Sequence, residues 1–184
     1  RRDSVGPGHR YTYIPAESSR DAAMYLDSES GRKQLVWRGT HLTDIVDLRA
    51  DVTHTFTSNF RSTQKYRNAR KFMENLKLQG VDFTNVDMHG YSLGGLVAAY
   101  MRNDLLTTDT NLSVVNPAAV VWNQEALRLY RQPNVHSTYN LADIVSVGLL
   151  ENCQGPQGCP HTRQIGTTYQ AVKDIIGDIS GNPV

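Results

Sequence analysis

A serine flanked by glycines is the feature of this sequence whose residue types and spacing could do chemistry. Ser92 stands between Gly90 and Gly94, in the stretch Met-His-Gly-Tyr-Ser-Leu-Gly-Gly of residues 88–95. The spacing Gly-x-Ser-x-Gly is typical of a sharp turn from a strand into a helix, where the glycines avoid clashes and the serine hydroxyl stands exposed. The pattern predicts a nucleophile elbow with Ser92 as the nucleophile. Because three fixed positions also recur by chance, a plain Gly-rich turn is the alternative.

Two residues later in the chain could activate this serine. A serine hydroxyl becomes nucleophilic when an imidazole takes its proton, and a carboxylate orients that imidazole. In α/β-hydrolases the order along the chain is Ser, acid, His, and His161 is the single histidine after Asp143. The other acidic residues between Ser92 and His161 lie on expected helices or in loops: Asp104, Asp109, Glu125 and Glu151. We therefore predict a triad of Ser92, Asp143 and His161, with His89 and His136 as strand or wall residues.

The triad residues also have less specific interpretations. Asp143 could cap a helix or a turn, and His161 could be an exposed loop histidine. Acyl transfer further needs two donors aimed at the oxyanion, and the amide of Leu93, next to the nucleophile, is one candidate. Thr40 offers an amide and a hydroxyl at the end of an early strand, and Gly39 lets that backbone approach. We predict Thr40 and Leu93 as the oxyanion hole; Thr40 could serve as a helix N-cap at the same time.

Strands and helices alternate along the chain and would position these residues. Strands are expected over 22–27, 33–40, 52–56, 81–88, 112–116, 134–142 and 162–165. Helices are expected over 42–48, 58–80, 93–106, 122–130 and 169–179. This alternation predicts a three-layer α/β-hydrolase-like fold, with a mainly parallel sheet and an antiparallel N-terminal hairpin. Sites in such sheets form at the carboxyl ends of strands, where Thr40, Ser92 and Asp143 all fall.

Length and composition indicate one domain over residues 1–184, of which 1–10 form a loosely held arm because they are polar and rich in Gly and Pro. The net charge is +1 and the Lys and Arg residues are scattered, which argues against binding to nucleic acid. No apolar run approaches the length that spans a membrane. The chain begins with Arg1 rather than methionine, so it could be part of a larger protein or assembly.

The only two cysteines lie close together. Five residues separate Cys153 from Cys159, and they include two glycines and a proline, so a disulfide that closes a small loop is favoured. Such a bond would favour a secreted or assembly-associated protein; otherwise the compartment stays open. A zinc site is disfavoured because the two thiols and His161 lack a fourth ligand and the usual spacing. The sequence predicts no metal and no cofactor.

Taken together, these motifs resemble the class 3 lipase family of α/β-hydrolases. The family patterns are a strand that ends in Arg-Gly-(Ser/Thr), an elbow Gly-His-Ser-Leu-Gly-Gly, and a late Asp and His. The matching segments follow the family order: Leu35–Thr40, Asp44–Leu48, Gly90–Gly95, Asn116–Pro117, Asp143–Val145 and His161. The resemblance implies the same triad and oxyanion hole in an ester hydrolase.

Two departures from the family limit what the resemblance implies. Tyr91 replaces the usual His of the elbow, and residues 41–50, at the position of the family's lid, are too short and too charged for a large apolar cover. The leading interpretation is a serine esterase or lipase that cleaves carboxylic esters, with an ester or lipid substrate and peripheral contact with lipid surfaces. The alternatives are an idle hydrolase-fold module of a larger assembly, and an acyltransferase with the same triad.

Overall fold

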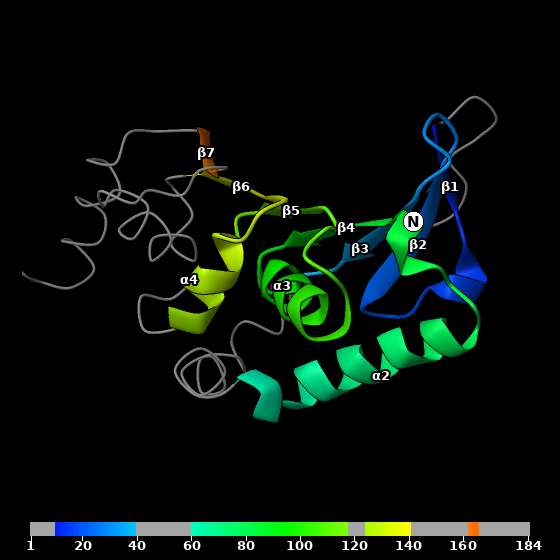
Figure 1. Ribbon diagram of the computed structural model, residues 1–184, viewed down its shortest axis with the longest axis horizontal. Coiled ribbons are helices and arrows are strands. Elements are labelled where there is room, and N and C mark those ends of the chain that lie inside the picture. The colour runs from blue at the N-terminus through cyan, green and yellow to red at the C-terminus, as the bar shows by residue number, and fades with distance from the viewer. Residues whose placement is uncertain (1–9, 40–59, 118–123, 141–161, 166–184) are drawn as a thin grey trace, which may run out of the picture.

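The computed structural model describes residues 10–39, 60–117, 124–140 and 162–165, which form one sheet covered by helices (Figure 1). The strands are β1 (Tyr11–Tyr13), β2 (Ala22–Asp27), β3 (Lys33–Trp37), β4 (Val86–Tyr91), β5 (Leu112–Val115), β6 (Val135–Asn140) and β7 (Thr162–Ile165). The helices are α2 (Gln64–Leu78), α3 (Leu93–Leu105) and α4 (Gln124–Tyr130). Short 3-10 turns are η1 (Pro15–Glu17), η3 (Phe60–Ser62) and η4 (Phe83–Asn85).

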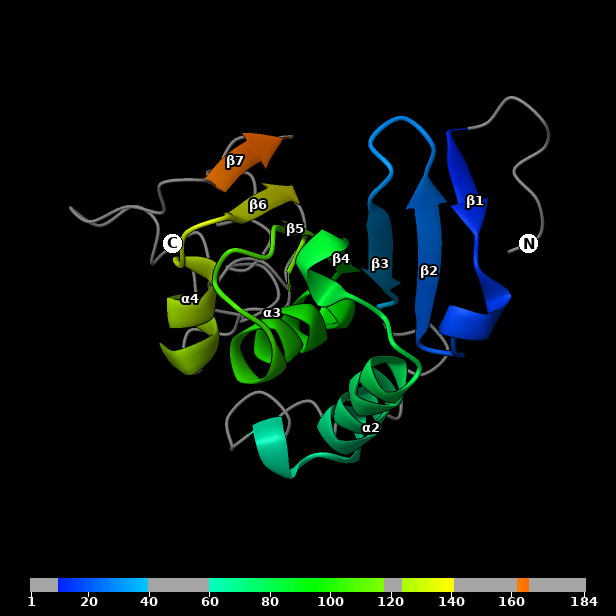
Figure 2. The ribbon, with the colours of Figure 1, turned by 45° about the vertical axis from the view of Figure 1, so that its right-hand side comes forward.

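The described strands lie in the sheet in the order in which they occur in the chain, from β1 to β7. Pairing is antiparallel from β1 to β3 and parallel from β3 to β7. The connections from β3 to β4, from β4 to β5 and from β5 to β6 each lead to the neighbouring parallel strand, always toward the same edge of the sheet. Because such crossovers are right-handed, their helices all lie on one face of the sheet. Figure 2 shows α2, α3 and α4 together on that face. The predicted α/β class, with its mainly parallel sheet and antiparallel N-terminal hairpin, is confirmed.

The hydrophobic core lies between the sheet and these helices. Strand residues that alternate along β2, β3 and β4 point into it and are fully buried: Met24, Leu35, Trp37 and Met88. Helices α2 and α3 supply the opposing side chains, among them Met73, Leu76, Leu96 and Val97. The period of two along the strands and of 3.6 along the helices is the pattern that predicted these elements.

A cluster around Arg61 fixes the three helices to one another. Its guanidinium donates to both oxygens of Asp104 on α3, at 2.8 and 2.7 Å, and to Glu125 on α4, at 2.7 Å. The same group lies over the ring of Tyr100, 5.0 Å from its centre. The hydroxyl of Tyr66 on α2 donates to Asp104 as well. One cation therefore holds together the start of α2, the end of α3 and α4.

Two boundaries differ by more than three residues from the sequence-based expectation, and one strand was not predicted. Helix α2 begins at Gln64 rather than near Ser58, because residues 60–62 form a 3-10 turn and the Thr63 hydroxyl caps the helix by accepting from the amide of Tyr66. Strand β4 begins only at Val86, after the turn η4. Strand β1 was not predicted. Its neighbour Arg10 is tied to Asp27 by two hydrogen bonds of 2.9 and 2.8 Å.

Several expectations fall outside the described residues. These are the arm before Arg10, the elements expected over 42–48 and 52–56, and the closing helix over 169–179. Within the described part of the chain, no helix is both long and apolar enough to cross a membrane.

Candidate active site

Ser92 occupies a strained turn between a strand and a helix. Strand β4 ends at Tyr91 and helix α3 begins at Leu93, so Ser92 is the single residue that joins them. Its backbone has φ 53° and ψ −125°, a region that non-glycine residues rarely adopt. Such a conformation persists only where its surroundings impose it, and it is common at functional sites. The sequence prediction of a nucleophile elbow at Ser92 therefore agrees with the local backbone.

Close backbone packing explains why the residues two before and two after Ser92 are glycines. A Cβ atom on Gly90 would lie 2.5 Å from the Cα of Gly95, and one on Gly94 would lie 2.4 Å from the carbonyl oxygen of Trp37. Real Cβ atoms do not approach other atoms this closely, so no side chain fits at either position. Gly95 is less restricted, since a Cβ there would meet only side chains, at 3.4 Å.

The end of β3 passes directly beside the serine. A Cβ atom on Gly39 would lie 2.8 Å from the carbonyl oxygen of Tyr91 and 3.3 Å from the Cβ of Ser92. The absence of a side chain at Gly39 therefore lets two backbones touch at the site. Thr40, the predicted second member of the oxyanion hole, is the next residue and lies outside the described part of the chain.

Hydrogen bonds from β4 to β6 complete the edge on which Ser92 stands. The amide of Ser92 donates to the carbonyl oxygen of Val115 at 3.1 Å, and the amide of Asn116 donates to Thr138 at 2.7 Å. Asn116 adopts φ 44°, a left-handed conformation that asparagine tolerates better than most residues. Sequence reasoning missed this second strained position, although the Asn-Pro pair at 116–117 is a recognisable signal of a turn.

Leu93, the other predicted oxyanion donor, starts α3. The first amides of a helix have no acceptor within the helix, and they carry the positive end of its dipole. The amide of Gly95 donates to the carbonyl oxygen of Ser92 at 2.9 Å, which closes the first turn. The amide of Leu93 is therefore suited to stabilise negative charge that develops beside Ser92.

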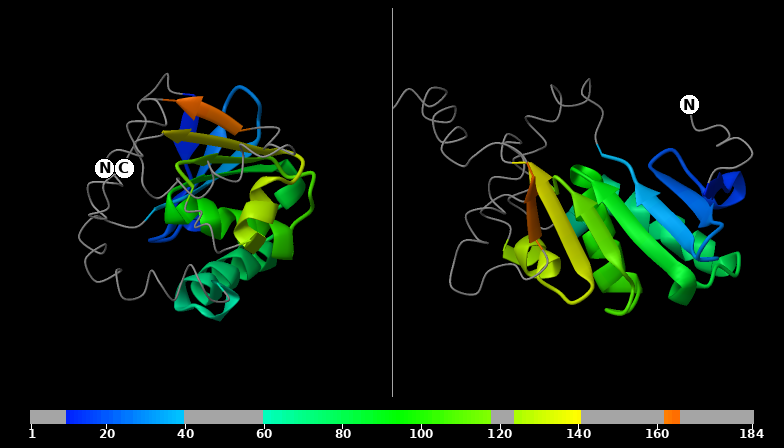
Figure 3. Two further views of the ribbon diagram at one scale, coloured as in Figure 1. Left: turned by 90° about the vertical axis from the view of Figure 1, so that its left-hand side faces the viewer. Right: turned by 90° about the horizontal axis from the view of Figure 1, so that it is seen from above.

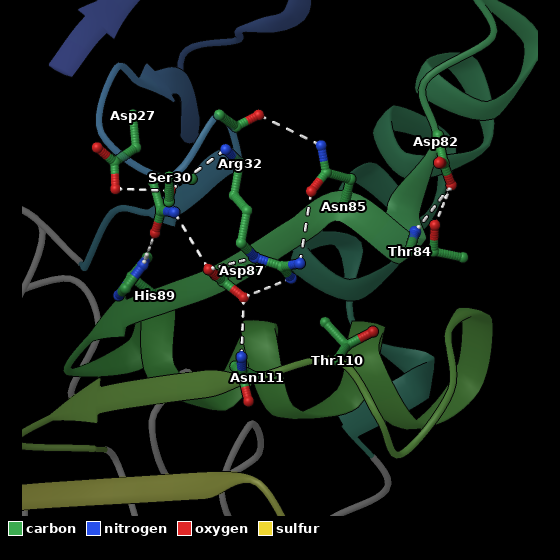
Figure 4. Close-up of polar contacts among 12 residues, drawn as sticks. Asp27, Ser30, Arg32, Asp82, Thr84, Asn85, Asp87, His89, Thr110 and Asn111 are labelled. Carbon is green, nitrogen blue, oxygen red and sulfur yellow. Dashed lines mark hydrogen bonds and ion pairs between the residues drawn. The ribbon is translucent and has the colours of Figure 1, made fainter.

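A polar network lies beneath the elbow, on the face of the sheet opposite the helices (Figure 4). Asp87 accepts hydrogen bonds from Arg32 at 2.8 and 3.0 Å, from Asn111 at 3.0 Å and from Gln34 at 3.2 Å. Burial alone would raise the pKa of Asp87, but these donors outweigh it and hold the pKa below its usual value. The Gln34 side-chain oxygen lies 2.6 Å from Nε2 of His89. The network ties β3, β4 and β5 together below Ser92.

The two described histidines lie below the edge that carries Ser92. Burial lowers the pKa of His89, which favours its neutral form. In the strand register, His89 on β4 pairs with Ser113 on β5, and Ser113 pairs with His136 on β6. Both histidines therefore lie three residues before the position of Ser92, measured along the strands. This agrees with the interpretation of both histidines as residues of the strands rather than as the catalytic base.

The remaining predicted residues lie outside the described part of the chain: Asp143, His161, Cys153 and Cys159. Strand β6 ends at Asn140, three residues before Asp143, and its carboxyl end lies at the same edge as Ser92. Strand β7 begins at Thr162, directly after His161. Thr162 pairs with Ser137, and the register then runs through β5 to Gly90 on β4. In the register of the sheet, the start of β7 therefore aligns with Gly90, two residues before Ser92 on β4.

The sheet order, the one-residue elbow and the helices packed on the sheet define an α/β-hydrolase fold. A solved structure with this fold is the Lip2 lipase from Yarrowia lipolytica, with a TM-score of 0.50 and 17% identity over 88% of this chain and 70% of that one. An esterase from Pyrobaculum calidifontis gives a TM-score of 0.40 and 11% identity over 93% of this chain and 83% of that one. No protein-family model matches the sequence, and no curated protein matches it. At such identities the likeness to Lip2 establishes a common fold.

Proposed function

We propose that this chain is a serine hydrolase of the class 3 lipase kind, which cleaves carboxylic esters through an acyl-enzyme on Ser92. The observation that carries the proposal is the backbone of Ser92. A serine at φ 53° between a strand and a helix, with Gly90 and Gly94 packed against backbone, is the geometry that exposes a nucleophile. A plain Gly-rich turn would not require a strained non-glycine residue at its apex.

In the proposed reaction, the Ser92 hydroxyl oxygen attacks the ester carbonyl carbon while its proton passes to the imidazole of His161. The resulting oxyanion is stabilised by the amide of Leu93 and by Thr40. The alcohol then leaves with the proton from the imidazole, and an acyl-serine remains. Water attacks the acyl-serine by the same route, which releases the acid and restores Ser92. Asp143 orients the imidazole and stabilises its charged form.

Two of the three acids between Ser92 and Asp143, Asp104 and Glu125, are committed elsewhere, which supports Asp143 as the third member of the triad. Asp104 and Glu125 both bind the guanidinium of Arg61. Asp104 also lies twelve residues along α3 from Ser92, which is about 18 Å at the rise of an α-helix. Neither carboxylate is positioned to orient a base beside Ser92.

The proposal places a specific geometric demand on His161. With strands about 4.8 Å apart and about 3.3 Å per residue, the Cα atoms of Thr162 and Ser92 are about 16 Å apart across three strand intervals and two residues. The Cα atom of His161 can be at most about 3.8 Å closer, which leaves about 12 Å. A hydrogen bond between the two side chains requires Cα atoms within roughly 11 Å. By these distances the His161 imidazole falls about 1 Å short of Ser92 even when the segment before β7 turns toward the elbow, so the proposal requires the start of β7 to lie closer to Ser92 than ideal strand spacing places it.

Labelling with a fluorophosphonate tests the nucleophile directly. We expect one equivalent of probe on the wild-type chain and none on the Ser92→Ala variant, with p-nitrophenyl acetate turnover lost in parallel. The matched control is Ser113→Ala on the adjacent strand β5, which should label and turn over like the wild type. Failure of the wild type to label would refute the proposal and favour a catalytically idle module. Labelling without net hydrolysis, but with acyl transfer to an added alcohol, would identify an acyltransferase.

The same assay separates the nucleophile from its base. His161→Ala and Asp143→Asn should each lower kcat by about 1,000-fold or more, and combining them with Ser92→Ala should add little, since the three act as a unit. If turnover is lost in Ser92→Ala but persists in His161→Ala, Ser92 would stand as the nucleophile and His161 would be excluded as the base.

A further inference from the structure

A hollow of about 370 Å³ lies over strands β1 to β4, on the sheet face opposite the helices. Figure 3 (right) looks onto this face, with the helices behind the sheet. Along β3, Gln34 and Val36 alternate with Leu35 and Trp37, which point into the core, so the hollow is separate from the core. Its volume falls within the range of small-molecule sites, about 300–1,000 Å³. It is lined by Tyr11, Tyr25, Gln34, Val36 and His89.

The lining of the hollow is largely apolar and carries no carboxylate, ammonium or guanidinium group. The rings of Tyr11 and Tyr25 and the side chain of Val36 supply its apolar surface. The guanidinium of Arg10 lies over the ring of Tyr11, 5.3 Å from its centre, but it already binds Asp27. A molecule in the hollow would therefore lose hydration without gaining an ion pair, which favours a neutral occupant over a charged one.

The polar network beside the hollow fixes the tautomer of His89. Asp87 is ionised, because its pKa is held low, so its carboxylate can only accept hydrogen bonds. Gln34 must then turn its NH₂ group toward Asp87, at 3.2 Å, and its oxygen toward Nε2 of His89, at 2.6 Å. An amide oxygen can only accept, so Nε2 carries the proton. Since the imidazole is neutral, Nδ1 is left as a bare acceptor.

This acceptor can be reached from the hollow. Nδ1 of His89 has no hydrogen-bond partner within the described part of the chain. The buried side-chain polar atoms without a partner, among the described residues, are Nε1 of Trp37 and Oγ of Ser137. Nδ1 of His89 is therefore not sealed from solvent, and the side chain that carries it lines the hollow. The hollow thus combines two aromatic rings and an aliphatic side chain with one oriented acceptor, a combination typical of a small-molecule site.

We propose that this hollow binds a neutral aromatic molecule with a hydroxyl group, of the phenol class, whose O–H donates to Nδ1 of His89. The ring of the ligand packs against Tyr25 and Val36, where aromatic contact adds to the burial of apolar surface. The hydrogen bond orients the ring and selects ligands that carry a donor. The proposal is independent of the chemistry of Ser92, because it rests on side chains of the opposite sheet face.

Titration of the full chain with phenol, followed by long-range ¹H–¹⁵N spectra of the histidine rings, tests the site. Before ligand is added, His89 should show the tautomer with the proton on Nε2. Phenol should then shift the Nδ1 resonance of His89 in a saturable way. Anisole has the same ring but no donor, and benzoate has the same ring but a charge. Each should bind at least about fivefold more weakly than phenol, because each leaves Nδ1 without a donor.

A substitution that fills the hollow locates the binding. Val36→Trp places a large ring among the lining residues and should weaken phenol binding at least about tenfold. The matched control is Val115→Trp on β5, whose side chain does not line the hollow. Val36 is 37% exposed and Val115 is 42% exposed, so both variants should fold, and circular dichroism verifies it.

Four results would overturn the proposal. These are no saturable effect of phenol on the wild-type chain, a proton on Nδ1 rather than Nε2 of His89, equal binding of phenol and anisole, and phenol binding that Val36→Trp leaves unchanged. Equal binding of phenol and anisole would mean that the hollow takes up apolar molecules without using His89.

Discussion

The packing of Gly94 against β3 allows the cost of one added methyl group to be worked out. In Gly94→Ala the new Cβ would start 2.4 Å from the carbonyl oxygen of Trp37 and 2.7 Å from the carbonyl group of Arg38. An ordinary contact requires a displacement of about 1 Å, and neither backbone is free to yield because β3 is a central strand. Overpacking of this kind costs about 1–3 kcal/mol, and we expect the upper end, about 3 kcal/mol.

Urea unfolding, followed by circular dichroism, measures this cost. With a denaturant slope of about 2 kcal/mol/M for a domain of this size, the midpoint of Gly94→Ala should fall by about 1.5 M. The adjacent Gly95→Ala is the matched control. Its Cβ would meet only Val114 and Pro117 side chains at 3.4 Å, while alanine favours the helix by up to about 1 kcal/mol, so its stability should stay within about 1 kcal/mol of wild type. Equal midpoints for the two variants would refute steric selection of glycine at position 94.

Four further outcomes follow from the structure and the proposal. Arg61→Met should lower the free energy of unfolding by about 2 kcal/mol, because Asp104 and Glu125 lose charged donors; wild-type stability in a urea titration would contradict this. Burial alone would raise the pKa of Asp104, but Arg61 and other donors hold that pKa below its usual value. The ionised carboxylate therefore stabilises the fold above about pH 4, and this stabilisation is lost as pH falls through the folded pKa. Asp104→Asn should therefore flatten the acid side of the stability profile, and an unchanged acid slope would argue against the carboxylate. The ratio kcat/KM should rise through one titration near neutrality and then level off, as His161 becomes neutral; a flat profile with rate-limiting chemistry would exclude a histidine base. Soluble short-chain esters should be cleaved below their aggregation limit, because residues 41–50 are short and charged; a sharp rise in rate when droplets form would identify that segment as a working lid.

The elbow was predictable because its signals are local. Two glycines around Ser92 and a change of periodicity from two to 3.6 lie within about twenty residues, and each has a steric cause that the structure shows. Helix α3 begins and ends within one residue of the expected positions for the same reason. Strand β1 was missed because three residues, Tyr11 to Tyr13, are too few for alternation to be visible before Pro15.

Long-range pairing could not be read from the sequence in the same way. The strand order and the pairing of Thr162 with Ser137 depend on contacts between segments far apart in the chain. Chain order alone suggested His161 as the base, whereas the register of β7 shows how far its imidazole would have to reach. The start of α2 was placed too early because the side chain of Thr63, rather than the hydrophobic pattern, determines where the helix begins.

The position of Ser92 between two neighbouring strands has a consequence for biosynthesis. Its conformation is imposed from one side by Trp37, against which Gly94 packs, and from the other by the carbonyl oxygen of Val115. At a synthesis rate of about 5–20 residues per second, Ser92 leaves the ribosome about 1–5 s before Val115, the last residue of β5. During that interval the contact with β5 is missing, so the strained backbone of Ser92 is held from both sides only after β5 has paired with β4.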